Sequence, residues 1–313
     1  MRVLIAGGTG FIGSNLARRM AALGAEVHSV SRGGAPSCLV PGVTYHAADL
    51  QDDRLARLFA RLMPNYVFLL ATRTRPRRGE SAARGMLTGL EDAADSVRLV
   101  EAVAALARKP DVVVRAGSLA EYGAAPLPMH EDGPAHPVTP YAAGMLAGTH
   151  AAGLAARRAG VRFVTARLAL IYGQGQDGRF FVPATIRALL GGRASHVATP
   201  LARRDLMHVD DAVDGLLRIA SRAPDDLPVV NLATGRAERM GDVAAMIARA
   251  ARRDGSAVIR HSDPASDILL GCTERAKERL GWTARVPLED GIARTVLEEA
   301  GAVGGRRELE DVT

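Results

Sequence analysis

The chain has 313 residues, of which 48% are hydrophobic and only 4% aromatic, so its core is expected to consist mainly of Ala, Val, Leu and Ile. The net charge is +6, but the scattered arginines lack interleaved aromatic residues, which argues against nucleic-acid binding. The two cysteines, Cys38 and Cys272, are far apart in sequence and show no metal-ligand spacing. They exclude a disulfide framework, which favours a reducing compartment such as the cytoplasm. No apolar run approaches the ~20 residues of a membrane span.

Strand-like apolar runs alternate with helical patterns through the first half of the chain. Strands are expected at 3–6, 26–30, 43–46, 66–70 and 112–115 and near 162–167, and helices at 11–22, 52–61, 84–107 and 141–158. This alternation predicts an α/β fold built on a doubly wound parallel sheet, the Rossmann arrangement.

A glycine-rich turn joins the first expected strand to the first expected helix. Gly7, Gly10 and Gly13 follow the spacing G-x-x-G-x-x-G, and Thr9, Phe11 and Ile12 complete the segment. Glycines here permit a tight turn and close approach of backbone amides to a pyrophosphate, which the helix N-terminus also attracts. A plain glycine-rich turn is the alternative, but the strand and helix context predicts that these residues bind a dinucleotide.

Arg32 follows the second expected strand and bears on the choice of dinucleotide. An acidic residue at this place would accept a hydrogen bond from the ribose 2′-hydroxyl of NAD, whereas an arginine suits the 2′-phosphate of NADP. Arg32 therefore favours NADP(H). The alternative is an arginine that only covers the edge of the adenine.

Two later segments resemble the active-site segments of the extended short-chain dehydrogenase/reductase family. Ser118 lies within 116–123, a segment that ends in Tyr-Gly, and Tyr141 follows Pro140 at the start of a helix. The resemblance implies that Ser118 holds a substrate carbonyl oxygen and that Tyr141 exchanges a proton with it. A turn serine is the alternative for Ser118.

The same resemblance, which extends over about residues 2–299, implies further contacts with the cofactor. Asp49 is similar to a family residue that contacts the adenine, although an ordinary helix N-cap is a serious alternative. Leu70 and Ala71 stand where the family has a small apolar turn beside the cofactor.

Position 145 departs from the family pattern, because Met145 stands where the Tyr-x-x-x-Lys motif has its lysine. Met145 is thus expected at the cofactor without the charge that would lower the pKa of Tyr141 from about 10. Residues 142–149 offer no other cation, and Arg73 and His136 are candidates from elsewhere in the chain. A neutral Tyr141 suits proton donation in a reduction better than the start of an oxidation. Alternatively, the substrate supplies its own acidic proton.

Beyond residue 168 the alternation becomes irregular, with short strands near 195–199, 207–209 and 228–231 and helices near 180–190, 210–220, 239–252 and 288–299. We expect a dinucleotide-binding domain over 1–168 and, over 169–300, a smaller C-terminal substrate-binding lobe with some segments that return to the first domain. The last residues, 301–313, are expected to form a flexible tail.

The resemblance also assigns residues of this lobe to the substrate. Arg204 and Arg260 match arginines that hold the diphosphate of nucleotide sugars in the family, whereas ion pairing with Asp205 or Asp263 is the alternative. Leu170 stands where many such members have a substrate-contacting Asn. An apolar pocket at Leu170 would suit an aromatic polyketide ketone.

The sequence therefore predicts an NADPH-dependent ketoreductase of secondary metabolism, such as antibiotic biosynthesis. Its small-molecule substrate would be a polyketide-type ketone or a dTDP-keto-deoxysugar, and the pattern is most similar to the branch that reduces 4-keto groups of dTDP-deoxysugars. A nucleotide-sugar epimerase or dehydratase with a relocated cation, and a non-enzymatic NADP-binding protein, are the alternatives. A homodimer formed through the helices at 84–107 and 141–158 is a further hypothesis.

Overall fold

The computed structural model describes residues 1–72, 81–261 and 267–310. The chain divides into two compact units, of which the first comprises Met1–Leu168, Val213–Leu232 and Cys272–Thr283. The second comprises Ala169–Ala212, Ala233–Gly271 and Ala284–Thr313. Within the described ranges, no helix combines the length and apolar character that crossing a membrane requires.

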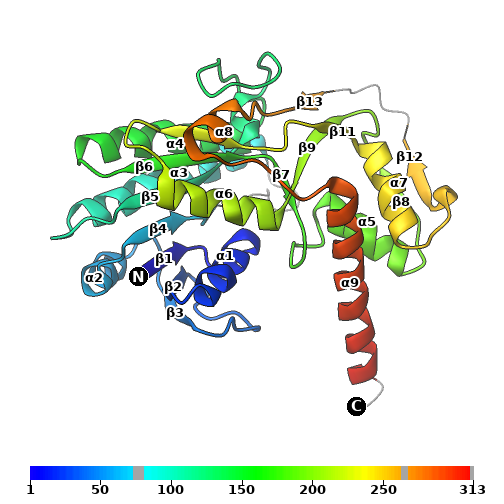
Figure 1. Ribbon diagram of the computed structural model, residues 1–313, viewed down its shortest axis with the longest axis horizontal. Coiled ribbons are helices and arrows are strands. Elements are labelled where there is room, and N and C mark those ends of the chain that lie inside the picture. The colour runs from blue at the N-terminus through cyan, green and yellow to red at the C-terminus, as the bar shows by residue number, and fades with distance from the viewer. Residues whose placement is uncertain (73–80, 262–266, 311–313) are drawn as a thin grey trace. The chain divides into compact units, whose positions relative to one another are not determined.

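The first unit is built on a seven-stranded sheet in the order β10-β6-β5-β4-β1-β2-β3, with every neighbouring pair parallel (Figure 1). The strands are β1 (Arg2–Ala6), β2 (Glu26–Ser31), β3 (Val43–Ala47), β4 (Tyr66–Leu69), β5 (Val112–Ser118), β6 (Phe163–Leu168) and β10 (Val229–Leu232). The predicted α/β fold is thereby confirmed. Strand β5 continues three residues beyond the expected end, so Ser118 is its last residue.

Three helices share a hydrophobic core with one face of this sheet. They are α2 (Asp53–Leu62), α3 (Ala82–Ala104) and α4 (Pro140–Arg158). Phe59, Leu99 and Ala152, one from each helix, are fully buried in this core together with Leu4 of the first strand. Helix α1 (Phe11–Ala22) follows the glycine-rich turn, the short helix η1 (Leu119–Tyr122) follows β5, and α8 (Glu274–Leu280) also belongs to this unit.

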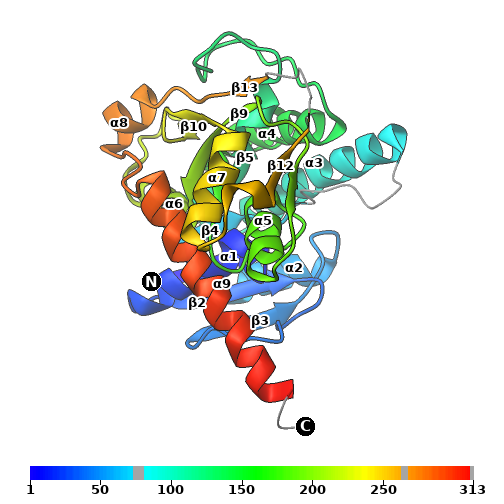
Figure 2. The same cartoon turned by 90° about the vertical axis from the view of Figure 1, so that its right-hand side faces the viewer.

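Helices α3 and α4 lie side by side in both views of the molecule (Figures 1 and 2). They are in backbone contact at Gly89 and Gly144, where a Cβ atom added to Gly89 would lie 2.9 Å from the Cα atom of Gly144. Any larger side chain at either position would push the helices apart. This close approach fixes the start of α4, which carries Tyr141, against the N-terminal half of α3.

The second unit contains short strands and three complete helices within the described residues. Its strands are β7 (Leu170–Tyr172), β8 (Ser195–Val197), β9 (Arg203–His208), β11 (Ala237–Arg239), β12 (Val258–Arg260) and β13 (Ile268–Leu269). Its helices are α5 (Phe181–Leu190), α7 (Met240–Ala250) and α9 (Leu288–Glu310), together with the short helix η2 (Gly255–Ala257). Helix α6 (Val209–Arg222) begins in this unit and continues into the first.

Strand β9 is the central strand of the second unit, because β7, β11 and β13 all pair with it, while β8 and β12 form a separate pair. The carboxylate of Asp205 within β9 is buried and accepts hydrogen bonds from the Thr234 and Gly235 amides at 2.9 and 3.0 Å. The sequence did not predict β7, β11, β12 or β13, because strands of two or three residues show no periodicity. Helix α9 continues to Glu310, where a flexible tail from residue 301 was expected.

Candidate active site and cofactor site

The turn between β1 and α1 has the geometry of an anion site. Gly7 has a positive φ of 87°, and its amide donates to the Val30 carbonyl at 2.8 Å. A Cβ atom on Gly13 would lie 2.8 Å from the Cα atom of Gly8, so only glycine allows the first turn of α1 to pack here. Gly10 caps α1 without a side-chain hydrogen bond. The first amides of the helix therefore point to a place where a pyrophosphate would be bound favourably.

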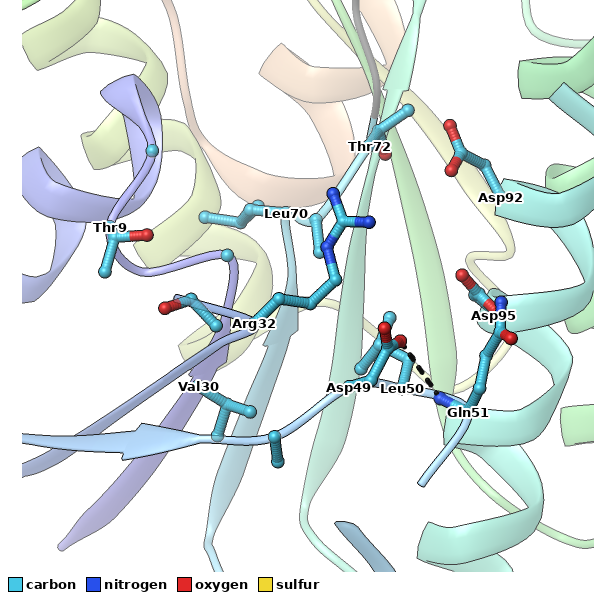
Figure 3. Close-up of a pocket in the computed structure, with 15 residues that line it drawn as sticks. Thr9, Val30, Arg32, Asp49, Leu50, Gln51, Leu70, Thr72, Asp92 and Asp95 are labelled. Atoms are coloured by element: carbon cyan, nitrogen blue, oxygen red, sulfur yellow. Dashed lines mark hydrogen bonds between the residues drawn. The ribbon is translucent and has the colours of Figure 1, made fainter. Parts of the chain in front are cut away.

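A cavity of about 350 Å³ opens beside this turn (Figure 3). Of the predicted cofactor-binding residues, seven line it: Gly7, Thr9, Gly10, Arg32, Asp49, Leu70 and Ala71. Phe11, Ile12 and Gly13 lie in the adjoining first turn of α1, and Met145 is buried in α4; none of these four is in the wall. The lining and the glycine turn together fit a dinucleotide.

Arg32 is exposed, and Figure 3 shows its side chain extending into the cavity. A guanidinium in this position can bind an anionic group of a ligand through paired N–H donors. Asp49 lies at the same cavity, where its carboxylate accepts a hydrogen bond from the Gln51 amide at 3.3 Å. The N-cap of α2 is Asp52, which accepts from the Arg54 amide at 2.8 Å, so the helix-cap alternative for Asp49 was wrong.

Two aspartates of α3 also line the cavity and were not identified from the sequence. Asp92 and Asp95 are three positions apart and therefore share one face of the helix. The Asp95 carboxylate accepts a hydrogen bond from Arg98 at 2.8 Å. The sequence did contain a signal for them, because Asp92 and Asp95 place two carboxylates among the small and apolar residues Gly89, Ser96 and Leu99 of α3.

The structure brings Ser118 and Tyr141 together, although they are 23 positions apart in sequence. Thr139 caps α4 by accepting a hydrogen bond from the Ala142 amide at 3.2 Å, and Pro140 opens the helix, which places Tyr141 in its first turn. The Ser118 side chain lies close enough to the Tyr141 phenol to lower its pKa. Ser118 also caps η1 through the Ala120 amide at 3.1 Å, so it is a turn serine as well.

Four neighbouring groups and burial act on the Tyr141 phenol. Burial is the largest influence and raises the pKa of Tyr141 above its ordinary value near 10. The Ser118 side chain and the positive charge of Arg115 lower it, whereas the negative charges of Glu121 and Asp92 raise it. Because the net direction is upward, Tyr141 carries its proton at neutral pH.

Beneath Tyr141 lies a buried network of charged side chains. Glu121 is fully buried and accepts hydrogen bonds from Arg167 at 2.8 Å, from Thr149 at 2.9 Å and from the Ser118 amide at 3.0 Å. The Arg115 guanidinium lies 4.0 Å from the same carboxylate. An arginine within the buried run Val112–Ser118 was the sequence signal for this network, and it was missed.

Two cations, His136 and Arg73, were proposed from the sequence as replacements for the missing lysine. His136 is exposed and is not among the groups that act most strongly on Tyr141. Within the described ranges, the cation among those groups is Arg115. Arg73 lies outside the described residues. Among the described residues, the cation that acts most strongly on Tyr141 is Arg115 of β5.

The predicted substrate residues all belong to the second unit. Arg204 is ion-paired with Asp267 at 2.7 Å, rather than with Asp205, and Asp263 lies outside the described residues. Arg260 donates a hydrogen bond to the Gly241 carbonyl at 3.1 Å. Leu170 begins β7 opposite Leu206 and is partly buried.

The cysteines show no metal-ligand spacing along the chain, yet His130, Cys272 and Glu274 bring their ligand atoms within 4.8 Å of one another. Burial and the nearby carboxylates of Glu274 and Glu131 raise the pKa of the Cys272 thiol. We assign no metal to this cluster.

Comparison with known proteins places this geometry in a family. Residues 3–233 match the model of the NAD dependent epimerase/dehydratase family. A dTDP-6-deoxy-L-talose 4-dehydrogenase (NAD(P)(+)) from Kitasatospora kifunensis is 34% identical over 93% of each chain. A UDP-glucose 4-epimerase from Mycolicibacterium smegmatis is 31% identical over 95% of this chain and 97% of its own.

A solved structure described as MoeE5 in complex with UDP-glucuronic acid and NAD has the same fold, with a TM-score of 0.85. It is 28% identical over 96% of this chain and 100% of its own. This chain therefore belongs to the NAD dependent epimerase/dehydratase family of extended short-chain dehydrogenases/reductases, for which NAD(P) is the typical cofactor.

Proposed function

We propose that this chain is an NADPH-dependent ketoreductase whose substrate is a 4-keto-deoxysugar linked to dTDP. The observation that carries the proposal is a buried, protonated Tyr141 beside Ser118, with Met145 in place of the lysine that would favour the phenolate. A protonated phenol is the correct form for giving a proton to a carbonyl oxygen that is being reduced. The similarity to a dTDP-6-deoxy-L-talose 4-dehydrogenase supports the sugar class.

Each residue has a defined part in this reaction. The glycine turn and the N-terminus of α1 would bind the pyrophosphate of NADPH, and Arg32 its 2′-phosphate. When bound, NADPH supplies the hydride that forms the new C–H bond. The Ser118 hydroxyl would donate a hydrogen bond to the carbonyl oxygen, and Tyr141 would transfer its proton to that oxygen. Water then returns a proton to Tyr141, which restores the starting state.

The direct test incubates the chain with NADPH and a dTDP-4-keto-6-deoxyhexose while the absorbance of NADPH is followed. We expect NADPH to be consumed and a 4-hydroxy sugar nucleotide to form. An aromatic polyketide ketone is the second substrate to be tried, because the apolar Leu170 favours that class. Consumption of NADPH with neither ketone would exclude a ketoreductase of these two classes, and turnover of a nucleotide sugar without added reductant would indicate an epimerase or dehydratase.

Arg204 and Arg260 are proposed to hold the diphosphate of the sugar nucleotide, an assignment that rests on the family resemblance. The ion pair of Arg204 with Asp267 orients its guanidinium. If the substrate is a polyketide ketone without a diphosphate, neither arginine should affect its KM.

Replacing Arg32 with alanine is expected to weaken NADPH binding by about 10- to 150-fold, the equivalent of losing charged hydrogen bonds worth about 1.5–3 kcal/mol. NADH binding should change far less, since NADH lacks the 2′-phosphate. Calorimetric titration of both cofactors measures the two effects. Arg222→Ala, at an exposed arginine in the last turn of α6, is the matched control. Equal weakening of NADPH and NADH would show that Arg32 only covers the adenine.

The chain is also expected to form a homodimer through α3 and α4. Leu87 and Leu90 of α3 and Leu154 of α4 are 53%, 51% and 45% exposed, which leaves apolar surface on the two helices. Light scattering should give twice the chain mass of 32.9 kDa, and Leu90→Glu should reduce it to the mass of a monomer. A monomeric mass for the unchanged chain contradicts this prediction.

A further inference from the structure

We propose that Arg115 is a positioning residue for Tyr141: its buried guanidinium supplies the positive charge that a lysine at position 145 would otherwise bring, and Met145 is the side chain that accommodates it. This inference rests on the proposed role of Tyr141 as the proton donor. It explains where the positive charge near Tyr141 comes from without a lysine, and why an uncharged side chain stands at position 145.

Arg115 lies against the face of α4 that carries Tyr141. Its Nη2 atom donates to the Met145 carbonyl at 3.1 Å and lies 3.9 Å from the Met145 sulfur, while Nη1 donates to the Thr149 hydroxyl at 3.0 Å. Met145 and Thr149 are four and eight positions after Tyr141, and residues with this spacing share one face of a helix. The guanidinium is thus held against the second and third turns of α4, on the face that also carries Tyr141.

The surroundings are shaped for a guanidinium. Arg115 is only 2% exposed, and a side chain on Gly148 would overlap its Nη2 and Cζ atoms. The polarisable thioether of Met145 is a weak acceptor that tolerates the N–H groups beside it. A lysine at position 145 would instead bring a second cation against the guanidinium in a buried place, where like charges repel strongly.

The charged groups around Tyr141 are two cations and two carboxylates, with Asp92 as the second carboxylate. Arg115 and Arg167 are the cations, and Glu121 is the carboxylate between them. Burial lowers the pKa of Arg115 and the Glu121 carboxylate opposes this change, while a guanidinium in a protein keeps its charge. The groups acting most strongly on Tyr141 are Ser118 and Arg115 of β5, Glu121 of η1 and Asp92 of α3.

This balance suits a proton donor. Before the reaction, Glu121 and Asp92 favour the protonated phenol. When Tyr141 gives its proton to the substrate oxygen, the O–H bond breaks and a phenolate is left. Arg115 stabilises that negative charge until water returns the proton, so its contribution is greatest when the proton is transferred.

The test compares four forms of the full chain: the unchanged protein, Met145→Lys, Arg115→Met, and the double variant that carries both substitutions. Met145→Lys alone should lower the thermal unfolding midpoint and the rate of reduction, because two cations then compete for one buried place. Arg115→Met alone should lower kcat without a matching change in KM. The double variant should recover in both respects, since it again holds a single cation.

A readout independent of turnover is the titration of Tyr141, followed as tyrosinate absorbance with a Tyr141→Phe form of each protein subtracted. Arg115→Met should move this titration upward by about one pH unit, as expected for loss of a nearby opposite charge, and the double variant should return it. Arg108→Met is the matched control, since the exposed Arg108 also donates to a backbone carbonyl. An unchanged Tyr141 titration in Arg115→Met would overturn the proposal.

Two further comparisons keep the outcome decisive. If Arg115→Met does not fold, Met145→Leu and Met145→Lys in the unchanged background still discriminate, because only the lysine should lower the unfolding midpoint; equal midpoints would overturn the proposal. If the titration and the midpoints behave as expected but no ketone is reduced, the role of Arg115 stands and the proposed function fails. If a ketone is reduced while the effects of the two substitutions are simply additive, the proposed function stands and the role of Arg115 fails.

Discussion

Replacing Tyr141 with phenylalanine is expected to lower kcat for ketone reduction by about 100- to 10,000-fold, the usual contribution of a positioned general acid. The substitution removes only the hydroxyl, so the ring should still occupy the first turn of α4. Binding of NADPH should be nearly unchanged, because Tyr141 is not in the wall of the cofactor cavity. Steady-state rates together with a cofactor titration separate the two effects.

Tyr45→Phe is the matched control for this experiment. The Tyr45 hydroxyl accepts a hydrogen bond from the Val40 amide at 3.0 Å within the same unit, so its loss tests the removal of a hydrogen-bonded phenol elsewhere. We expect full activity in that variant. A Tyr141→Phe enzyme that keeps its rate would instead show that the substrate provides the proton, as a ketone beside a phenol could.

Replacing Glu121 with leucine is expected to lower the free energy of unfolding by about 3–5 kcal/mol, the cost of breaking a buried ion pair from one side. Arg115 and Arg167 are 2% and 4% exposed, so both would keep buried charges after losing the carboxylate that lies between them. The Ser118 amide and the Thr149 hydroxyl would also lose their acceptor. A loss of this size is among the largest that single substitutions cause.

Urea unfolding followed by the fluorescence of Trp282 measures this effect, because Trp282 is buried in the same unit as Glu121. Glu26→Leu is the control, since Glu26 forms an exposed ion pair with Arg2 that should contribute little. If Glu121→Leu unfolds at the same urea concentration as the unchanged chain, the buried charges are compensated by other groups, and the network described above does not hold the site together.

Local patterns were sufficient for the parts of the molecule that local chemistry controls. The strand run before Gly7 and the glycine spacing identified the dinucleotide turn, because that turn is made by consecutive residues. The position of Arg32 at the end of the second strand placed it at the cavity for the same reason. By contrast, an N-cap was a serious alternative for Asp49, and only the backbone geometry shows that Asp52 is the cap of α2.

The amino-acid pattern was enough to predict the parallel α/β fold and the glycine turn, and the family resemblance was enough to pair Ser118 with Tyr141. The contact on which the proposed role of Arg115 depends is visible only in the folded chain. Arg115 and Met145 are 30 positions apart and meet only because β5 and α4 pack together, with Gly148 leaving room for the guanidinium. Spacing along a chain does not encode such a contact, since the fold brings together charges from β5, η1, β6 and α3 that no local pattern connects.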